Sequence, residues 1–219
     1  MNGRFTFVGQ ILKDEIRQQI AAAALEVFAR EGFLRATMAQ IAREAGISTG
    51  NIYRYHATKE GLFEELIGDE LPATLTRLLK RRVAALRGVS DVGALKPNAP
   101  YHLLAGEMLR YCIDNRLRVI ILLGRSDGTR YAAFAEETVR LSQRLAVAHF
   151  RAGRPRLSLS EAQRFDLAII YRNYLGAMVA ILAQFSDERR IREAVEAYDR
   201  YHLAGVRAFF CGYTPANHS

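Results

Sequence analysis

The chain has 219 residues, half of them hydrophobic and a quarter charged, which is the balance of a soluble globular protein with one large or two small domains. It lacks an uninterrupted apolar run of about 18 residues and an apolar signal-peptide core, so the sequence predicts a cytoplasmic protein with no membrane segment. The formal charge of +8 favours a polyanionic partner, but residues 1–60 hold eight Lys or Arg against six Asp or Glu, so charge alone locates no binding site.

The first predicted helix covers residues 14–31. Apolar side chains recur there at the spacing of one helical face, and Gly32 follows them as a residue that ends a helix easily. The apolar positions are Ile16, Ile20, Ala23, Ala24, Val27 and Phe28.

Two short helices joined by a tight turn are predicted next, at about 38–45 and 49–56. Thr37 is an N-cap candidate for the first, and Gly46 suits a left-handed residue at its end. Ser48 or Thr49 then caps the second helix, which in a helix-turn-helix lies in the DNA major groove. The expected core residues around this motif are Ile41, Ala45, Ile47, Ile52 and Phe63.

From about Arg17 to Leu66 the chain resembles the DNA-binding domain of TetR-family transcriptional regulators. The residues that carry the resemblance are Ala24, Phe28, Gly32, Phe33, Thr37, Ile41, Ala42, Ala45, Gly46, Ile47, Ile52, Tyr53, Tyr55, Lys59, Leu62 and Phe63. The resemblance implies an all-α protein with an N-terminal three-helix DNA-binding domain, residues 1–66. A larger helical bundle for ligand binding and dimerisation, residues 67–219, would follow.

Direct base contacts are expected from the exposed N-terminal part of the recognition helix, which is the second helix of the motif. Asn51 can pair with adenine, Arg54 with guanine or a phosphate, and Gly50 lets the backbone approach the duplex. The alternative is that Asn51 and Arg54 are ordinary solvated residues. The candidate base-contacting residues are Ser48, Thr49, Gly50, Asn51 and Arg54.

The resemblance assigns Thr37, Tyr53, Tyr55 and Lys59 to phosphate contacts or to their support. Thr37 and Lys59 stand at predicted helix N-termini, where the helix dipole favours an anion. Core packing is the alternative for Tyr55. His56 stands where the family usually has phenylalanine; we expect a hydrogen-bonded, partly buried histidine, with a pH-sensitive contact as the alternative.

A fourth helix is predicted to begin at Thr58, and Pro72 is expected either to kink it or to break it before a restart toward Leu86. The basic run at 80–82 is interpreted as a solvated helix face, and residues 88–100 as a loop. Further helices are predicted at about 101–114, 116–123, 129–152, 160–185 and 187–211, with Ser160 and either Ser186 or Asp187 as caps.

The last two predicted helices carry more apolar surface than one partner covers. A symmetric four-helix interface between two copies of the chain would bury the remainder, and the resemblance implies the same homodimer. Part of each helix is expected to be intrachain core instead. The candidate interface residues are Leu175, Val179, Leu182, Tyr198 and Val206.

Aromatic residues between the predicted C-terminal helices suggest a cavity for a small apolar or aromatic effector, although an aromatic stripe at helical spacing is also typical of a core. Arg125 or Arg130 is expected near its mouth. The candidate lining residues are Tyr101, Leu104, Met108, Tyr111, Arg125, Tyr131, Phe134, Tyr171 and Tyr174.

No catalytic motif or metal-ligand spacing is apparent, so the sequence predicts a non-enzyme without cofactor or metal. Cys112 and Cys211 are expected to be reduced thiols, with a disulfide or redox switch as the alternative. The predicted function is a transcriptional repressor that binds double-stranded DNA at a palindromic operator and is released by a small effector. The alternative is a similar DNA binder without such an effector, controlled by a protein partner or organising the chromosome.

Overall fold

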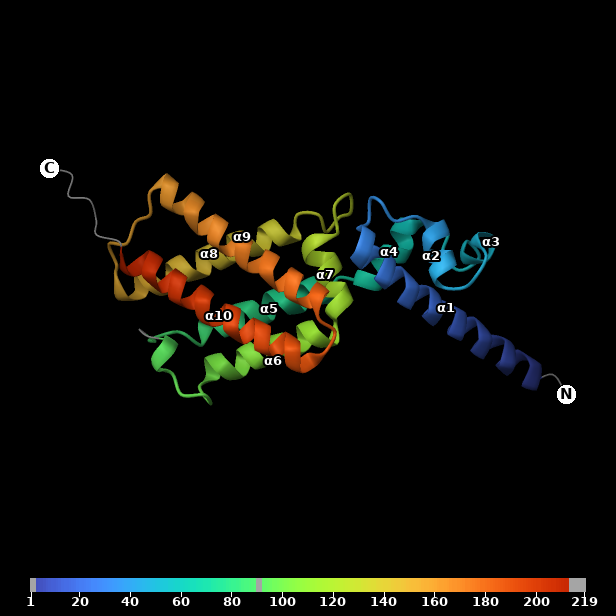
Figure 1. Ribbon diagram of the computed structural model, residues 1–219, viewed down its shortest axis with the longest axis horizontal. Helices are drawn as coiled ribbons and strands as arrows, with labels where there is room; N and C mark the ends of the chain where they lie inside the picture. Colours follow the sequence, from blue (N-terminus) through green and yellow to red (C-terminus); the bar gives the residue numbers. More distant parts are fainter. Residues whose placement is uncertain (1–2, 90–91, 213–219) are drawn as a thin grey trace. The chain divides into compact units, whose positions relative to one another are not determined.

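The computed structural model describes residues 3–89 and 92–212, and for residues 3–12 the backbone alone. All regular secondary structure within these ranges is helical, which confirms the predicted all-α class (Figure 1). The chain forms two compact units, one containing residues 1–71 and 117–132, the other residues 72–116 and 133–219. Residues 117–132, which the sequence analysis placed in the C-terminal domain, thus belong to the first unit.

The first unit is built around the N-terminal helices. A long helix leads into the two short helices of the predicted motif, a fourth helix follows, and a later segment returns to pack against them. Its elements are α1 (Gly3–Glu31), α2 (Met38–Glu44), α3 (Thr49–Ile52), α4 (Lys59–Ile67) and, from residue 117 on, α7 (Arg116–Gly124).

Phe63 is the centre of the first unit's core and is fully buried. Its ring lies edge-on to Phe28 at 5.2 Å and to Phe33 at 5.0 Å between ring centroids, geometries that aromatic pairs prefer. Tyr131, from the returning segment, completes the cluster at 6.3 Å. The core therefore joins α1, the turn after it, α4 and residues 117–132 into one body.

Backbone groups also attach the returning segment to the DNA-binding helices. The Phe33 amide donates to the Arg125 carbonyl at 3.0 Å, and the Arg118 guanidinium donates to the Ile67 carbonyl at the end of α4 at 2.9 Å. The Tyr131 hydroxyl donates to Asp69 at 3.2 Å. The turn after α1 and the C-terminal end of α4 are thus both linked to residues 117–132.

The chain breaks after α4 at Gly68, one turn earlier than expected from Pro72. Gly68 has φ 61°, a left-handed conformation that glycine adopts without steric cost, and α5 (Glu70–Ala84) begins two residues later. Pro72 therefore lies in the first turn of α5, where its missing N–H would have had no intrahelical partner. The predicted break and restart toward Leu86 therefore occurs, but at Gly68 and not at Pro72.

The second unit consists of α5 from Pro72 onward and the C-terminal helices. The Ser160 hydroxyl accepts from the Gln163 amide in a reciprocal capping box, and Asp187, rather than Ser186, caps the last helix. Residues 88–100 form the predicted loop apart from one 3-10 turn; residues 90 and 91 lie outside the described residues. The remaining elements are η1 (Val92–Ala94), α6 (Pro100–Asp114), α8 (Phe134–Gly153), α9 (Glu161–Gln184) and α10 (Glu188–Cys211).

Helix α8 begins five residues later than predicted because residues 126–132 form turns instead. The Thr129 hydroxyl donates to the Ser126 carbonyl at 2.7 Å and accepts from the Tyr131 amide at 3.1 Å, so it stabilises a turn in place of a helix. Gly128 has φ 83°, which also ends any helical continuation through this stretch.

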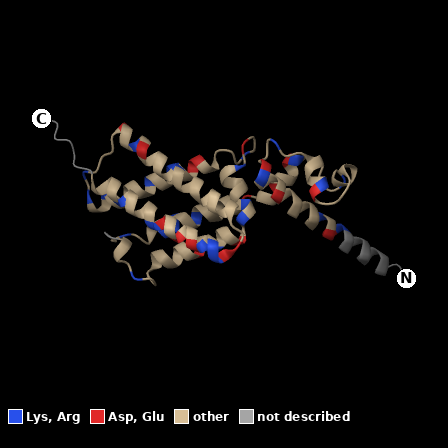
Figure 2. Cartoon of the chain, viewed as in Figure 1, with Lys and Arg blue, Asp and Glu red and all other residues tan. Residues whose placement is uncertain are grey.

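Helix α9 is strongly apolar, although the rest of its own unit buries little of its surface. Residues 173–184 contain no Lys, Arg, Asp or Glu, and Figure 2 shows this half of the helix in tan. By length and composition α9 would be long enough to cross a membrane, yet only 11% of the apolar window is buried within the chain. The same composition suits a helix covered by a second protein surface.

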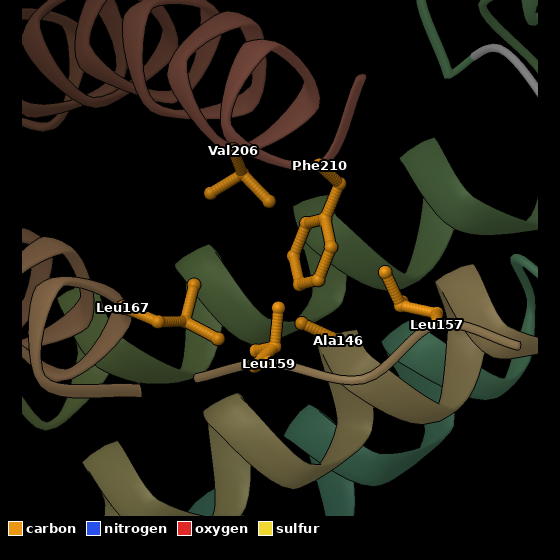
Figure 3. Close-up of a cluster of buried hydrophobic side chains, with 6 residues drawn as sticks. All are labelled: Ala146, Leu157, Leu159, Leu167, Val206 and Phe210. Carbon is orange, nitrogen blue, oxygen red and sulfur yellow. The ribbon is translucent and has the colours of Figure 1, made fainter. Parts of the chain in front are cut away.

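The main hydrophobic cluster of the second unit joins α8, α9, α10 and the loop between α8 and α9 (Figure 3). Phe210 is fully buried and stacks on Phe150 with 4.1 Å between ring centroids. Leu157 and Leu159 from the loop enter the same cluster, so the loop is fixed by apolar burial. The cluster comprises Ala146, Leu157, Leu159, Leu167, Val206 and Phe210.

Candidate nucleic-acid interface and ligand cavity

The helix-turn-helix forms through local signals that the sequence contains. The Thr37 hydroxyl accepts from the Gln40 amide at 3.2 Å while the Gln40 side chain accepts from the Thr37 amide at 2.8 Å, a capping box that fixes the start of α2. Gly46 has φ 68° and turns the chain out of α2. The Ser48 hydroxyl accepts from the Asn51 amide at 3.2 Å, so Ser48, rather than Thr49, caps α3.

The recognition helix is shorter than expected: α3 ends at Ile52, and residues 53–55 continue as a turn. Ile52 is fully buried and anchors this segment to the core, whereas Ala45 and Ile47, expected in the core, are only half-buried. The polar residues around Ile52 consequently face outward. Ser48, Thr49, Gly50, Tyr53 and Arg54 are exposed, and Asn51 and Tyr55 are half-buried.

Gly50 lies on the open side of the recognition helix. A Cβ atom at this position would meet no protein atom within 4 Å, so packing within the chain does not require glycine there. The open space agrees with the predicted close approach of a duplex, which remains a prediction.

Lys59 has partners inside the protein that the sequence did not reveal. Its Nζ donates to the Phe33 carbonyl at 2.7 Å and to the Ala36 carbonyl at 2.9 Å, and it lies 4.3 Å from the centroid of the Phe33 ring. These contacts tie the start of α4 to the turn between α1 and α2. Lys59 thus positions that turn, and only the remaining N–H of its ammonium is available for a phosphate.

His56 is buried, with 9% of its surface exposed, at the position where the family that the sequence resembles usually has phenylalanine. Its Nδ1 lies 3.5 Å from the Glu65 carboxylate, while its buried Nε2 has no hydrogen-bond partner within the described residues. The expectation of a hydrogen-bonded histidine is therefore only half fulfilled.

Replacement of His56 by phenylalanine is expected to stabilise the protein. An unsatisfied buried polar group costs about 1–3 kcal/mol, and phenylalanine would fill the same space without it. Thermal unfolding followed by circular dichroism should show a melting temperature raised by a few degrees. The control is Glu65→Gln, which keeps the imidazole and weakens only its charge contact; a lower melting temperature for His56→Phe would contradict the argument.

The second unit encloses a cavity of about 480 Å³, within the usual size range of small-molecule sites. Four predicted residues line it: Tyr101, Met108, Tyr171 and Tyr174. Leu104, Tyr111 and Phe134 belong to the same unit but not to the lining, and Arg125 and Tyr131 lie in the first unit, in the contacts described above. Arg130 is there too, with Nη2 2.8 Å from Asp69.

A buried polar cluster that the sequence analysis missed lies beside this cavity. Arg82 Nη2 donates to the Tyr101 hydroxyl at 2.9 Å and to Asp199 Oδ2 at 2.8 Å, and the Tyr174 hydroxyl donates to Asp199 Oδ1 at 2.5 Å. The interpretation of residues 80–82 as a solvated face is thus wrong for Arg82. The available signal was its spacing of four residues from Leu78 and from Leu86, both buried.

Burial controls the protonation of the groups around the cavity. Burial lowers the pKa of His202 to about 4, an effect that Asp199 opposes, and burial also lowers the pKa of His149. Burial raises the pKa of Tyr171 and that of Tyr101, the latter opposed by Arg82. At neutral pH the two histidines are therefore uncharged and the tyrosines protonated.

The predicted interface residues on α9 and α10 divide between several environments. Leu182 and Val206 are buried within the chain, Leu175 and Val206 line the cavity, and Val179 and Tyr198 are half-buried. Leu182 and Val206 therefore have little surface left for a partner. Other residues on the same helices are exposed: Phe165 (64%), Ile169 (37%), Gly176 and Ala180 on α9, and Tyr201 (72%), Ala204 and Ala208 on α10.

Comparisons with known proteins match the helix-turn-helix segment. Residues 20–66 match the family model "Bacterial regulatory proteins, tetR family". The chain is 45% identical over 51 residues to the HTH-type transcriptional regulator HbdR of Aromatoleum sp. (strain CIB), covering 23% of this chain and 22% of HbdR. It is 38% identical over 76 residues to the regulator BetI of Escherichia coli O45:K1, covering 35% of this chain and 39% of BetI. The matches thus span less than half of these relatives' length.

Among solved structures, NalD of Pseudomonas aeruginosa, the secondary repressor of the MexAB-OprM multidrug efflux pump, aligns with 85% of this chain and 96% of its own, at 19% identity and TM-score 0.38. The similarity of the whole chain is therefore slight, and the family assignment depends on the N-terminal segment. The capped helix-turn-helix defines the class, a helix-turn-helix DNA-binding protein. Within that class, residues 20–66 are similar to the DNA-binding segment of the bacterial regulatory proteins of the tetR family.

Proposed function

We propose that this chain is a dimeric repressor that binds a palindromic operator in the cytoplasm and is released from it by a small molecule. The observation that carries the proposal is the exposed polar side of the recognition segment, fixed to a buried core through Ile52 and capped by Ser48. The named relatives HbdR and BetI, transcriptional regulators that match in this segment, support the same conclusion.

The proposed roles follow the exposure of each residue. Asn51 and Arg54 read base edges, because an amide pairs with adenine and a guanidinium with guanine in the major groove. Thr37, Tyr53 and Tyr55 contact the DNA phosphates or support such contacts. Ser48 and Thr49 lie at the N-terminus of α3, where backbone N–H groups would face a DNA phosphate. Lys59 acts mainly by holding the turn that presents Thr37.

Replacement of Asn51 by alanine is expected to relax the preference for one base pair in each half-site. The lost discrimination is about 1–3 kcal/mol for a bidentate contact, whereas affinity for random DNA stays nearly unchanged. The operator is first selected from a random duplex library with the wild-type protein, and both proteins are then compared on it and on its single-base variants. Equal losses on operator and random DNA would contradict a base-reading role for Asn51.

Dimerisation through α9 and α10 follows from the uncovered apolar side of these helices. Phe165 and Ile169 from α9 and Tyr201 from α10 leave large apolar surfaces in water, and the small residues Gly176 and Ala204 permit close helix approach. A twofold axis would place the same surface on both copies, as palindromic DNA requires of its reader.

Ligand control would use the path of the chain between the two units. The chain crosses between them at residues 71/72, 116/117 and 132/133. Residues 117–132 are attached to the DNA-binding helices through Arg118 and Arg125, and the helices on either side of this segment, α6 and α8, both contribute to the cavity lining. A ligand that shifts α6 or α8 would therefore act directly on a segment fixed to α4. Pro72, in the first turn of α5, is not needed as a hinge.

A further inference from the structure

The cavity lining has an unbalanced set of polar side chains. Its walls are largely apolar, with Leu79, Val83 and Phe150 among them. Among the described lining residues there is no Asp or Glu, whereas the basic side chains are Arg82, Arg200, Arg207, His102, His149 and His202. His149 and His202 are uncharged at neutral pH, so the positive potential of the lining rests on Arg82, Arg200 and Arg207, whose guanidinium groups add donors without acceptors.

Arg82 has guanidinium N–H groups that its hydrogen bonds within the protein do not use. Its side chain is 12% exposed, and its hydrogen bonds to Tyr101 and Asp199 both use Nη2. Its Nε is buried and has no hydrogen-bond partner in the described part of the chain. A buried donor of this kind is costly unless an acceptor from water or a ligand completes it.

Asp199 neutralises Arg82 without offering an acceptor to a ligand. Each of its oxygens already accepts a hydrogen bond, one from Arg82 and the other from Tyr174, and Asp199 is not part of the lining. The raised pKa of Tyr101 and of Tyr171 keeps both hydroxyls protonated as donors. A cationic ligand would meet like charge and excess donors here, whereas an anion would meet partners for both.

The cavity also has a polar end and an apolar end. Asp199, which marks the polar cluster, precedes Val206 by seven residues on α10, or about 10 Å along a helix. Val206 and Ala146 belong both to the lining and to the apolar cluster of Figure 3. A ligand that satisfies both ends therefore needs a polar head and an apolar body of about this length.

We propose that the cavity binds an organic carboxylate with an aromatic or otherwise apolar body, its carboxylate at the Arg82–Tyr101 end and its body against Ala146 and Val206. This inference deepens the proposed function, because it names the chemical class of the effector. The planar guanidinium of Arg82 suits a carboxylate in particular, and the exposed side chain of Arg200 adds positive charge at the lining.

Matched pairs of acid and amide test the class of ligand. Calorimetry at pH 7.5 compares biphenyl-4-carboxylate with biphenyl-4-carboxamide, 2-naphthoate with 2-naphthamide, and 4-phenylbutanoate with its amide. At least one acid is expected to bind about tenfold or more tighter than its amide, the effect of a hydrogen bond to a charged group. Amides that bind as well as the acids, or acids none of which bind, would overturn the proposal.

Arg82→Lys tests the head-group position because it keeps the charge opposite Asp199 and removes the planar guanidinium. The preference for acid over amide is expected to fall about tenfold. Arg144→Lys, at an exposed position of α8 outside the lining, should leave the preference unchanged. An unaltered preference in Arg82→Lys overturns the assignment of Arg82; if circular dichroism shows that this variant does not fold, the acid and amide pairs on the wild-type protein decide.

The titration is repeated with operator DNA, which separates the ligand class from the proposed function. Coupling is reciprocal, so DNA should lower the affinity for the acid by the factor by which the acid lowers the affinity for DNA. An acid that binds equally with and without DNA supports the ligand class and contradicts the switch, which favours control by a protein partner. An amide that releases DNA as well as its acid supports the switch and overturns the ligand class.

Discussion

Ile169→Arg is expected to convert the dimer into a monomer and to abolish specific operator binding. Ile169 lies on the uncovered side of α9, and a twofold interface would bury one unpaired guanidinium from each copy. An uncompensated buried charge costs about 3 kcal/mol or more, so the dimer should weaken at least roughly 100-fold. Sedimentation gives the oligomeric state, and gel shifts with operator and random duplexes give the binding.

The matched control is Leu103→Arg. Leu103 is an exposed leucine in the same unit, but it lies on α6 and not on α9 or α10. This variant should remain dimeric and keep its operator affinity. A dimeric Ile169→Arg protein, or dissociation of both variants alike, would contradict an interface on α9 and α10.

The helix-turn-helix was predictable because its determinants are local in sequence. The Thr37 cap, the left-handed Gly46 and the Ser48 cap each act within a few residues, and each is present as the pattern indicated. The same holds for the start of α9 at Ser160. The signal for the end of α4 at Gly68 was equally local. The prediction placed the break at Pro72 instead, although proline is well tolerated in the first turn of a helix.

The rest depended on contacts between distant residues. Lys59 bonds carbonyls 23 and 26 residues before it, and Arg82 pairs with Asp199, 117 residues away, so neither role is visible in helical periodicity. The sequence predicts Tyr131 as an aromatic residue of the cavity lining and Arg125 as a cation near its mouth. The chain instead returns to the first unit at 117–132.

The sequence identified α9 and α10 as apolar helices but did not determine which side of each faces the unit's own core. Leu182 and Val206 pack inside, while Phe165 and Tyr201 remain outside. Both sides are apolar, so composition could not separate them; the packing of α8 and the loop residues Leu157 and Leu159 determines which side is covered. An apolar pattern therefore predicts that a surface is buried, but not by which partner.

Lys59→Met is expected to lower stability, whereas Arg54→Met is expected to change DNA binding and leave stability nearly unchanged. Lys59 donates to the carbonyls of Phe33 and Ala36, so its loss should lower the free energy of unfolding by about 1–3 kcal/mol. The Arg54 side chain is exposed and makes no hydrogen bond or ion pair to any other residue that the structure describes, so its loss should leave stability within about 0.5 kcal/mol. Urea unfolding is followed by circular dichroism, since the chain has no tryptophan.

The salt dependence of operator binding completes this comparison. Loss of a residue that neutralises a phosphate lowers the slope of log affinity against log salt by about 1, whereas loss of a residue that reads a base relaxes the preference at that base position. Arg54→Met should change the slope or the base preference, because the whole guanidinium is free to face DNA. Lys59→Met should weaken DNA binding mainly because part of the protein is unfolded or holds the α1–α2 turn in the wrong position. The slope of log affinity against log salt should therefore match that of the wild-type protein. A slope lowered by about 1 in Lys59→Met at unchanged stability would instead show that the ammonium reaches a phosphate and that its bonds to the α1–α2 turn are dispensable.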